Sequence, residues 1–174
     1  MDLKPKNKIA AVFLILVVLT VAFIFVQSAI PPETSGAQSD KVGGVIVDAA
    51  EGVINTDTEK GAQVFESISS FVVQYIRKIA HFTEFGVLGV FVCMYLFVNR
   101  NERKVRFKMP FNVTFCLFSI CFSIVVAFVD ETIQEFSNRV PAVPDMWIDI
   151  AGFATLYAIA YVILIFVGRR RDEI

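Results

Sequence analysis

The sequence is poor in the residues that most often crosslink chains or bind metals, with three cysteines and one histidine among 174 residues. Cys93, Cys116 and Cys121 all lie in apolar stretches and form no CxxC pair, which argues against a disulfide framework and against a soft-metal site. Neither an HExxH zinc motif nor a DxD-type arrangement occurs. No basic, aromatic-rich surface appears outside short loops, so we expect no nucleic-acid partner.

Long apolar runs, in contrast, are abundant. The chain is 56% hydrophobic and has a positive mean hydropathy, which is too apolar for an ordinary soluble domain. The first run, Ile9–Val26, would be about 27 Å long as a helix, enough to span the hydrocarbon of a bilayer. We therefore predict an all-α integral membrane protein with one domain, 1–174, and four transmembrane helices at about 9–26, 79–98, 111–129 and 147–167.

The first run has a second interpretation, as a cleaved signal peptide. Its charged start fits that reading, and Ala29 could occupy a cleavage position. However, the apolar region is long for a signal peptide, and Gln27 is too large for a small-x-small site. We expect an uncleaved anchor.

The distribution of lysine and arginine predicts the orientation of the four spans. Eleven of the 16 basic residues flank the spans on one side, namely Lys4, Lys6, Lys8, Arg100, Arg103, Lys104, Arg106, Lys108, Arg169, Arg170 and Arg171. Because short cytoplasmic segments are enriched in Lys and Arg, both termini should be cytoplasmic and the protein a multi-pass protein of the cell membrane.

The segment of about 27–78 between the first two spans is then extracytoplasmic. Pro31-Pro32 breaks the chain after the first span. Apolar residues then recur at helical spacing from Val42 to Ile54, and a second pattern from Val64 runs directly into the second span. This predicts an amphipathic helical loop on the outer surface, and docking of a partner or ligand is an alternative role for it.

Polar residues gather at the outer ends of three spans. Charged groups are costly near hydrocarbon, so such a cluster usually has a function. The candidate ligand-binding residues are Arg77, Lys78, His81, Glu84, Asp130, Glu131, Gln134, Arg139, Asp145 and Asp149. Helical spacing places Arg77, His81 and Glu84 on one face, and Asp130 and Gln134 on one face of the next span.

Structural roles for the same residues remain open. Lys78 could extend to the interface, Asp145 could cap a helix, and Arg77 or Arg139 could pair with Glu84 and Asp130 to hold the bundle together. His81 with Glu84 or Asp130 would also serve as an acid–base pair, so these three are candidate catalytic residues. A hard divalent cation is a further option, whereas we expect no organic cofactor.

The same residues carry a resemblance to the VanZ-like family of bacterial membrane proteins. The stretch from Arg77 to Phe85 resembles RKxxHFxEY, and Asp130 to Arg139, which reads DExxQxFxxR, is similar to the family's second motif with Ser137-Asn138 replacing the common Pro-Gly. Asp145, Asp149 and Gly152 match a trailing D…(D/N)…G, and Gln27-Ser28-Ala29 is similar to the lead-in of relatives. The matched part covers about 73–154.

The resemblance implies a cell-envelope protein, since the family takes its name from a protein associated with resistance to the glycopeptide teicoplanin. We expect an outward-facing polar pocket that binds an anionic lipid-linked or peptide ligand and affects glycopeptide susceptibility. The alternatives are a membrane enzyme acting on a lipid headgroup or cell-wall precursor, and a structural partner of another protein, as a homo- or hetero-oligomer.

Overall fold

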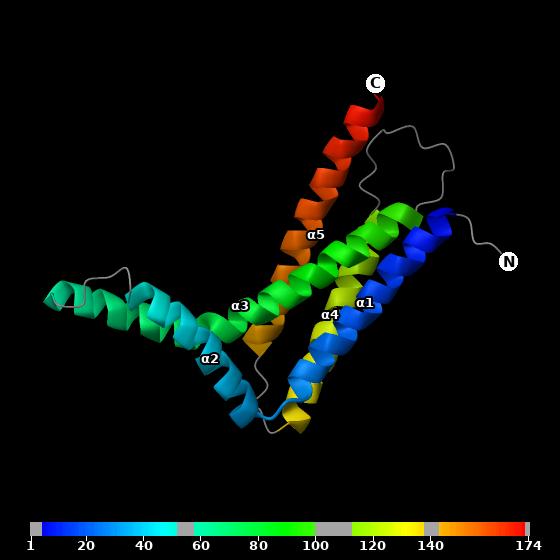
Figure 1. The fold of residues 1–174 in the computed structure, drawn as a ribbon. Coiled ribbons are helices and arrows are strands. Elements are labelled where there is room, and N and C mark those ends of the chain that lie inside the picture. The colour runs from blue at the N-terminus through cyan, green and yellow to red at the C-terminus, as the bar shows by residue number, and fades with distance from the viewer. Residues whose placement is uncertain (1–4, 52–57, 100–112, 138–142, 173–174) are drawn as a thin grey trace.

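The computed structural model describes residues 5–51, 58–99, 113–137 and 143–172, and nearly all of these residues lie in helices (Figure 1). The helices are α1 (Pro5–Ala29), α2 (Pro32–Glu51), α3 (Glu59–Asn99), α4 (Val113–Phe136) and α5 (Val143–Asp172). The predicted all-α fold class is confirmed for the described residues.

Four of the helices are long and apolar enough to cross a membrane. The spanning segments are Lys8–Ala29, Tyr75–Asn99, Phe115–Phe136 and Val143–Val167. They correspond to the four predicted runs, although the third and fourth are shifted toward the polar cluster. The third predicted span ends before Asp130 and the fourth begins at Trp147, whereas α4 continues to Phe136 and α5 begins at Val143.

The helix α3 is much longer than one span. Its 41 residues correspond to about 60 Å, roughly twice the hydrocarbon thickness of a bilayer. The first part of α3 projects from the bundle together with α2 (Figure 1). Thr58 caps this projecting end, because its Oγ1 accepts a hydrogen bond from the Gly61 backbone N–H at 3.1 Å.

The predicted loop is therefore helical where the structure describes it, but its amphipathic character is not confirmed. Val42 and Val45, expected on the apolar face, are exposed. The buried residue nearby is Gly43, which faces Val72 of α3. Helical periodicity identifies a face of α2 but not which face turns toward α3.

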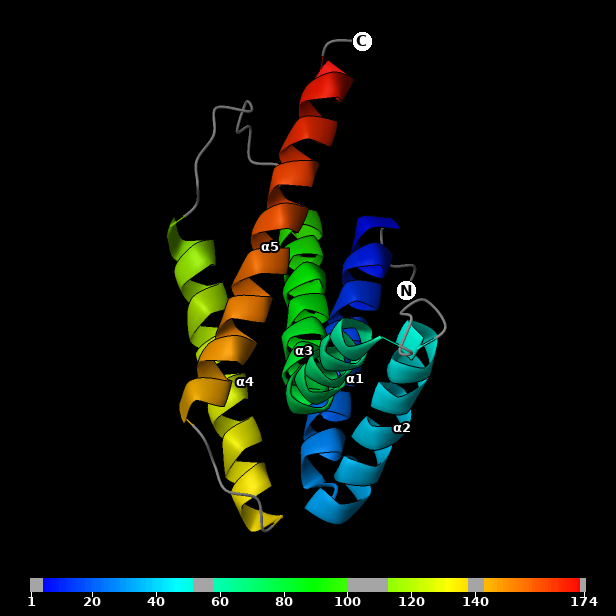
Figure 2. The same cartoon turned by 90° about the vertical axis from the view of Figure 1, so that its left-hand side faces the viewer.

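The ends of the helices agree with a four-span arrangement. The first residues of α1, the last residues of α3 and the last residues of α5 lie toward one end of the molecule (Figure 1). The end of α4 and the beginning of α5 lie toward the other (Figures 1 and 2). The end of α1 and the start of α5 are thus on the same side as α2 and the projecting first part of α3, which together form the arm.

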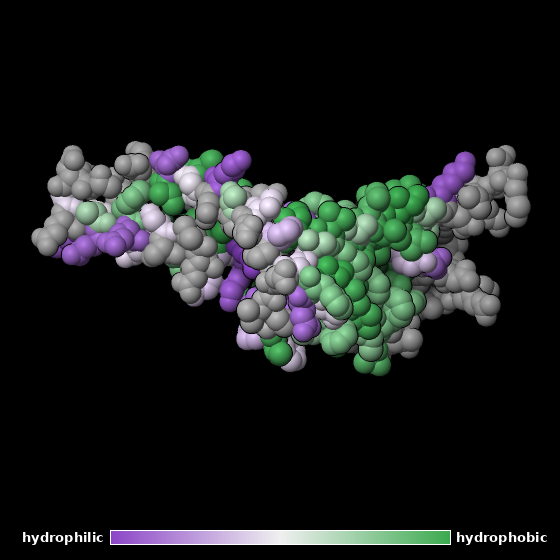
Figure 3. All heavy atoms as spheres, turned by 90° about the horizontal axis from the view of Figure 1, so that it is seen from below, coloured by the Kyte–Doolittle hydropathy of each residue, from purple (hydrophilic) through white to green (hydrophobic). Residues whose placement is uncertain are grey.

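A small core is enclosed by the bundle, and much apolar surface remains outside. Ile24, Phe85, Leu88, Ala127 and Phe153 are almost completely buried, and they come from α1, α3, α4 and α5. The outward positions carry large hydrophobic side chains such as Leu19, Val26, Phe128, Val162 and Phe166. Hydrophobic residues dominate the bundle in Figure 3, whereas hydrophilic residues gather along the arm and at its junction with the bundle. This distribution suits helices surrounded by lipid.

The contact between α3 and α5 is the most extensive one between two helices. It depends on three glycines. A Cβ at Gly152 would overlap the backbone carbonyl of Phe82, and a Cβ at Gly89 would overlap that of Phe153. At Gly86 a Cβ would lie 2.5 Å from Leu156 Cδ1. Small residues at such crossings let helix backbones approach closely in membranes.

Candidate functional site

The polar cluster is built where four helices meet at one level. Ser28 ends α1, His81 lies within α3, Asp130 is near the end of α4 and Asp149 is in the second turn of α5. The close crossing at Gly152, next to Phe82, brings α5 against the turn of α3 that carries His81. The fold therefore brings together residues that are more than a hundred positions apart.

A chain of hydrogen bonds joins three of the helices. Arg77 donates to Oε1 of Gln134 at 2.5 Å, and Nε2 of Gln134 donates to Oδ2 of Asp130 at 2.8 Å. The Ser28 hydroxyl donates to Oδ1 of Asp130. Both oxygens of this fully buried carboxylate are thus satisfied, which fixes its orientation.

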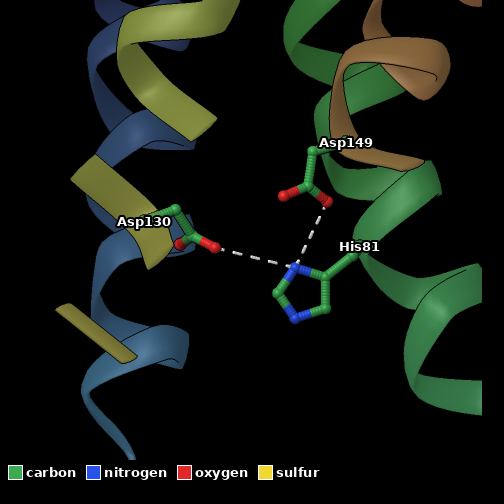
Figure 4. Close-up of side chains that lie close together, drawn as sticks. All are labelled: His81, Asp130 and Asp149. Carbon is green, nitrogen blue, oxygen red and sulfur yellow. Dashed lines mark ion pairs between the residues drawn. The ribbon is translucent and has the colours of Figure 1, made fainter. Parts of the chain in front are cut away.

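His81 lies between two buried carboxylates. Its Nδ1 is 3.8 Å from Oδ2 of Asp130 and 3.5 Å from Oδ1 of Asp149 (Figure 4). The side chain of His81 is 17% exposed, whereas those of Asp130 and Asp149 are 0% and 1% exposed. One imidazole thus faces two carboxylates away from water.

Asp149 differs from Asp130 in its surroundings. Neither of its carboxylate oxygens accepts a hydrogen bond within the part of the chain that the structure describes. The carboxylate points toward the imidazole of His81 (Figure 4). A buried carboxylate without hydrogen bonds is costly, so Asp149 is a group that an added ligand or ion would stabilise.

A cavity adjoins the cluster between α3 and α5. Its volume is about 160 Å³, and it is lined by Arg77, Lys78, His81, Asp145 and Ile148. Lys78 forms an ion pair with Asp145 at 3.4 Å, and both side chains are partly exposed. Asp145 also lies in the first turn of α5, where a negative charge is favourable, so the predicted capping region and the ion pair coexist.

The remaining predicted residues are more dispersed. Glu131 is buried. Glu84 is half-buried, and Glu84 forms no hydrogen bond or ion pair with another described residue. Pairing of Glu84 with Arg77 is therefore wrong. The two residues share a face, but they lie about 10 Å apart along the helix axis, and Gln134 meets Arg77 instead. Arg139 lies outside the described residues.

Ser28 is the cluster member whose role the sequence did not predict. It is almost completely buried at the end of a long apolar helix, and it contacts a residue 102 positions away. Two signals were available, its place at the cluster's level of the first span and the similarity of Gln27-Ser28-Ala29 to the lead-in of relatives, but nothing local specifies which helix it faces.

The hydroxyl of Ser28 donates to Asp130, and the other hydroxyls beside the cluster are engaged within their own helices. Thr83, Thr132 and Ser137 each donate to the backbone carbonyl four residues earlier in their own helix. These contacts do not activate a nucleophile. The arrangement instead suits binding of a cation by the carboxylates, binding of an anion by the basic residues, or proton transfer by His81.

The fold and the site define a multi-pass helical membrane protein with a buried acidic and imidazole cluster beside a basic cavity. A sequence model of the VanZ/LLP1 family matches residues 13–166, so the chain belongs to this family. The match extends well beyond the motifs at 73–154 and includes most of α1 and nearly all of the spanning part of α5. No curated protein matches the chain, and no solved structure does either.

Proposed function

We propose that this VanZ-family protein binds an anionic ligand of the cell envelope, lipid-linked or peptide, in the cavity between α3 and α5. The observation that carries this proposal is that Arg77 and Lys78 line one small cavity at the end of a membrane-spanning bundle. Guanidinium and ammonium groups are the usual partners of phosphate and carboxylate groups.

The size of the cavity limits what it holds. A volume of about 160 Å³ is well below the roughly 300–1,000 Å³ of pockets that enclose a whole small molecule. One phosphate or carboxylate group fits this space, whereas a whole lipid or peptide does not. The rest of the ligand would lie along the bundle or outside the membrane.

The charge distribution of the sequence supports an outward orientation for the cavity. Eleven of the 16 basic residues flank the opposite ends of the spans. The ligand would then be an outer-leaflet lipid headgroup or a cell-wall precursor. Through such binding the protein would affect susceptibility to teicoplanin-type glycopeptides.

The proposal is tested by removing the two basic groups of the cavity. In Arg77→Gln/Lys78→Gln we expect the amount of anionic lipid or precursor that co-purifies with the detergent-solubilised chain to fall by at least about tenfold. The reason is that each lost charge-assisted hydrogen bond contributes about 1.5–3 kcal/mol to binding. Mass spectrometry of the extracted small molecules measures this loss.

The matched control is Lys41→Gln/Lys60→Gln, which removes two exposed positive charges from α2 and the start of α3. It should retain the co-purified anions. Equal retention by both double variants would contradict binding in the cavity.

A second candidate function is an enzyme that acts on a lipid headgroup or precursor. It is favoured by the imidazole between two carboxylates, which is an arrangement suited to proton transfer. His81 would act as acid or base, since the hydroxyls of Thr83, Thr132 and Ser137 bond to their own helices. Recovery of a chemically altered ligand with the parent chain, and of the intact one with His81→Gln, would favour this alternative.

A further inference from the structure

The cluster of His81, Asp130 and Asp149 presents three metal-ligand atoms from three different helices. One donor atom from each residue lies within 4.8 Å of the other two (Figure 4). The set contains one imidazole nitrogen and two carboxylate oxygens. This mixture suits Zn²⁺ or a similar divalent transition-metal ion better than Mg²⁺ or Ca²⁺, which prefer oxygen ligands alone.

Two fully buried carboxylates face a single imidazole at this point. The basic side chains nearby form no ion pair with Asp149 among the described residues, because Arg77 donates to Gln134, which in turn donates to Asp130, and Lys78 pairs with Asp145. A bound cation would place positive charge beside Asp149, a buried acid in a membrane-spanning bundle.

Asp149 gives independent support for an ion. It is 1% exposed, it points toward His81, and neither of its oxygens accepts a hydrogen bond from a described residue. Asp130 shows a complementary feature of metal sites, in which neighbouring polar groups orient a metal ligand by hydrogen bonds. Ser28 and Gln134 hold its carboxylate from two sides.

The distances are close to those of a metal site. Two donors bound at about 2.0–2.1 Å to a tetrahedral ion lie roughly 3.3–3.4 Å apart. The observed separations from His81 Nδ1 are 3.5 Å to Asp149 and 3.8 Å to Asp130, and all three donor atoms lie within 4.8 Å of one another. A small rotation of the Asp149 carboxylate, which no hydrogen bond anchors among the described residues, would bring the donors together. The cavity lined by His81 provides access from water.

We infer that His81, Asp130 and Asp149 form a binding site for one Zn²⁺-like divalent ion, which joins α3, α4 and α5. This inference goes beyond the proposed ligand binding, because the ion is held by groups other than Arg77 and Lys78. The site also explains why a chain with a single histidine places it between two buried acids.

The test uses the full chain with Zn²⁺ as the probe. The chain is purified in detergent with a tag that contains no histidine, in a background where Cys93, Cys116 and Cys121 are serine, because thiols also bind zinc. After treatment with a chelator we expect one Zn²⁺ to bind per chain, measured by mass spectrometry of the metal. Zn²⁺ should also raise the Tm by several degrees, whereas Mg²⁺ should have little effect.

Two variants separate a metal site from a simple ion network. Asp149→Asn should weaken Zn²⁺ binding by more than about 100-fold, since even second-shell changes cost 10–100-fold. Zn²⁺ should raise the Tm of the parent but not that of this variant. Asp145→Asn, one turn earlier on α5, should bind zinc like the parent.

Other results would overturn the inference. They are the absence of stoichiometric zinc in the parent, or equal zinc binding by the parent and Asp149→Asn. An equal rise in Tm on addition of Zn²⁺ in the parent and in Asp149→Asn would do the same. The anion measurement on Arg77→Gln/Lys78→Gln is separate, so failure of one proposal is distinguishable from failure of the other.

Discussion

Replacement of His81 by Ala is expected to be the most destabilising single change in the cluster. It leaves Asp130 and Asp149, both fully buried, without the imidazole that the structure places beside both carboxylates. Removal of one partner from a buried ion pair typically costs about 3–5 kcal/mol. For a chain of this size that corresponds to a decrease in Tm of roughly 6–20 °C.

The measurement is thermal unfolding of the purified chain in detergent with a chelator present, so that bound metal does not contribute. Thr83→Ala, at an exposed position of the same helix, is the matched control and should change the Tm little. The double variant His81→Ala/Asp149→Asn should recover part of the loss, because it removes one of the two unpaired acids. If His81→Ala unfolds at the same temperature as Thr83→Ala, the carboxylates hold no uncompensated charge and the account of the cluster fails.

Gly152→Ala is expected to have the second largest effect, through packing rather than charge. The added Cβ would overlap the Phe82 carbonyl, and a backbone atom cannot rotate away as a side chain can. Overpacking usually costs about 1–3 kcal/mol, and this site should lie at the upper end of that range. The displaced α5 would also carry Asp149 away from His81.

A matched glycine substitution is available in α2. A Cβ at Gly44 meets nothing within 4 Å, so Gly44→Ala should be neutral or stabilising by up to about 1 kcal/mol. A Gly152→Ala variant that unfolds at the same temperature as Gly44→Ala would show that α3 and α5 are further apart than the structure has them.

Much of the fold was predictable because membrane-spanning segments leave a simple pattern. A long apolar run with few charges identifies a span without knowledge of its neighbours, and all four predicted runs overlap the observed spans. Convergence of His81, Asp130 and Asp149 was also predictable. Alternating spans place the end of α4 and the beginning of α5 at one level of the bundle.

The pairing within the cluster was less predictable. Periodicity shows that Arg77 and Glu84 share a face, but it does not show that Gln134 of α4 lies opposite Arg77. The contact of Ser28 with Asp130 depends on how α1 is rotated against α4. The close crossing at Gly86 and Gly89 likewise requires the relative position of two helices. Each of these features is a property of two elements, whereas the sequence pattern describes one.

The central claim is that the cavity beside His81 opens to the outside of the cell and attracts anions. The most direct measurement places a cysteine at Ile148, an uncharged position that lines the cavity, in a cysteine-free chain in intact cells. Two membrane-impermeant methanethiosulfonate reagents, one anionic and one cationic, are compared at this cysteine and at a control cysteine replacing the exposed Ala62. We predict that Ile148→Cys is labelled from outside, and that its ratio of anionic to cationic labelling rates exceeds that of Ala62→Cys, because Arg77 and Lys78 line the cavity. Labelling of Ile148→Cys only after the cytoplasmic face is exposed, or a ratio no greater than that of the control, would contradict the claim.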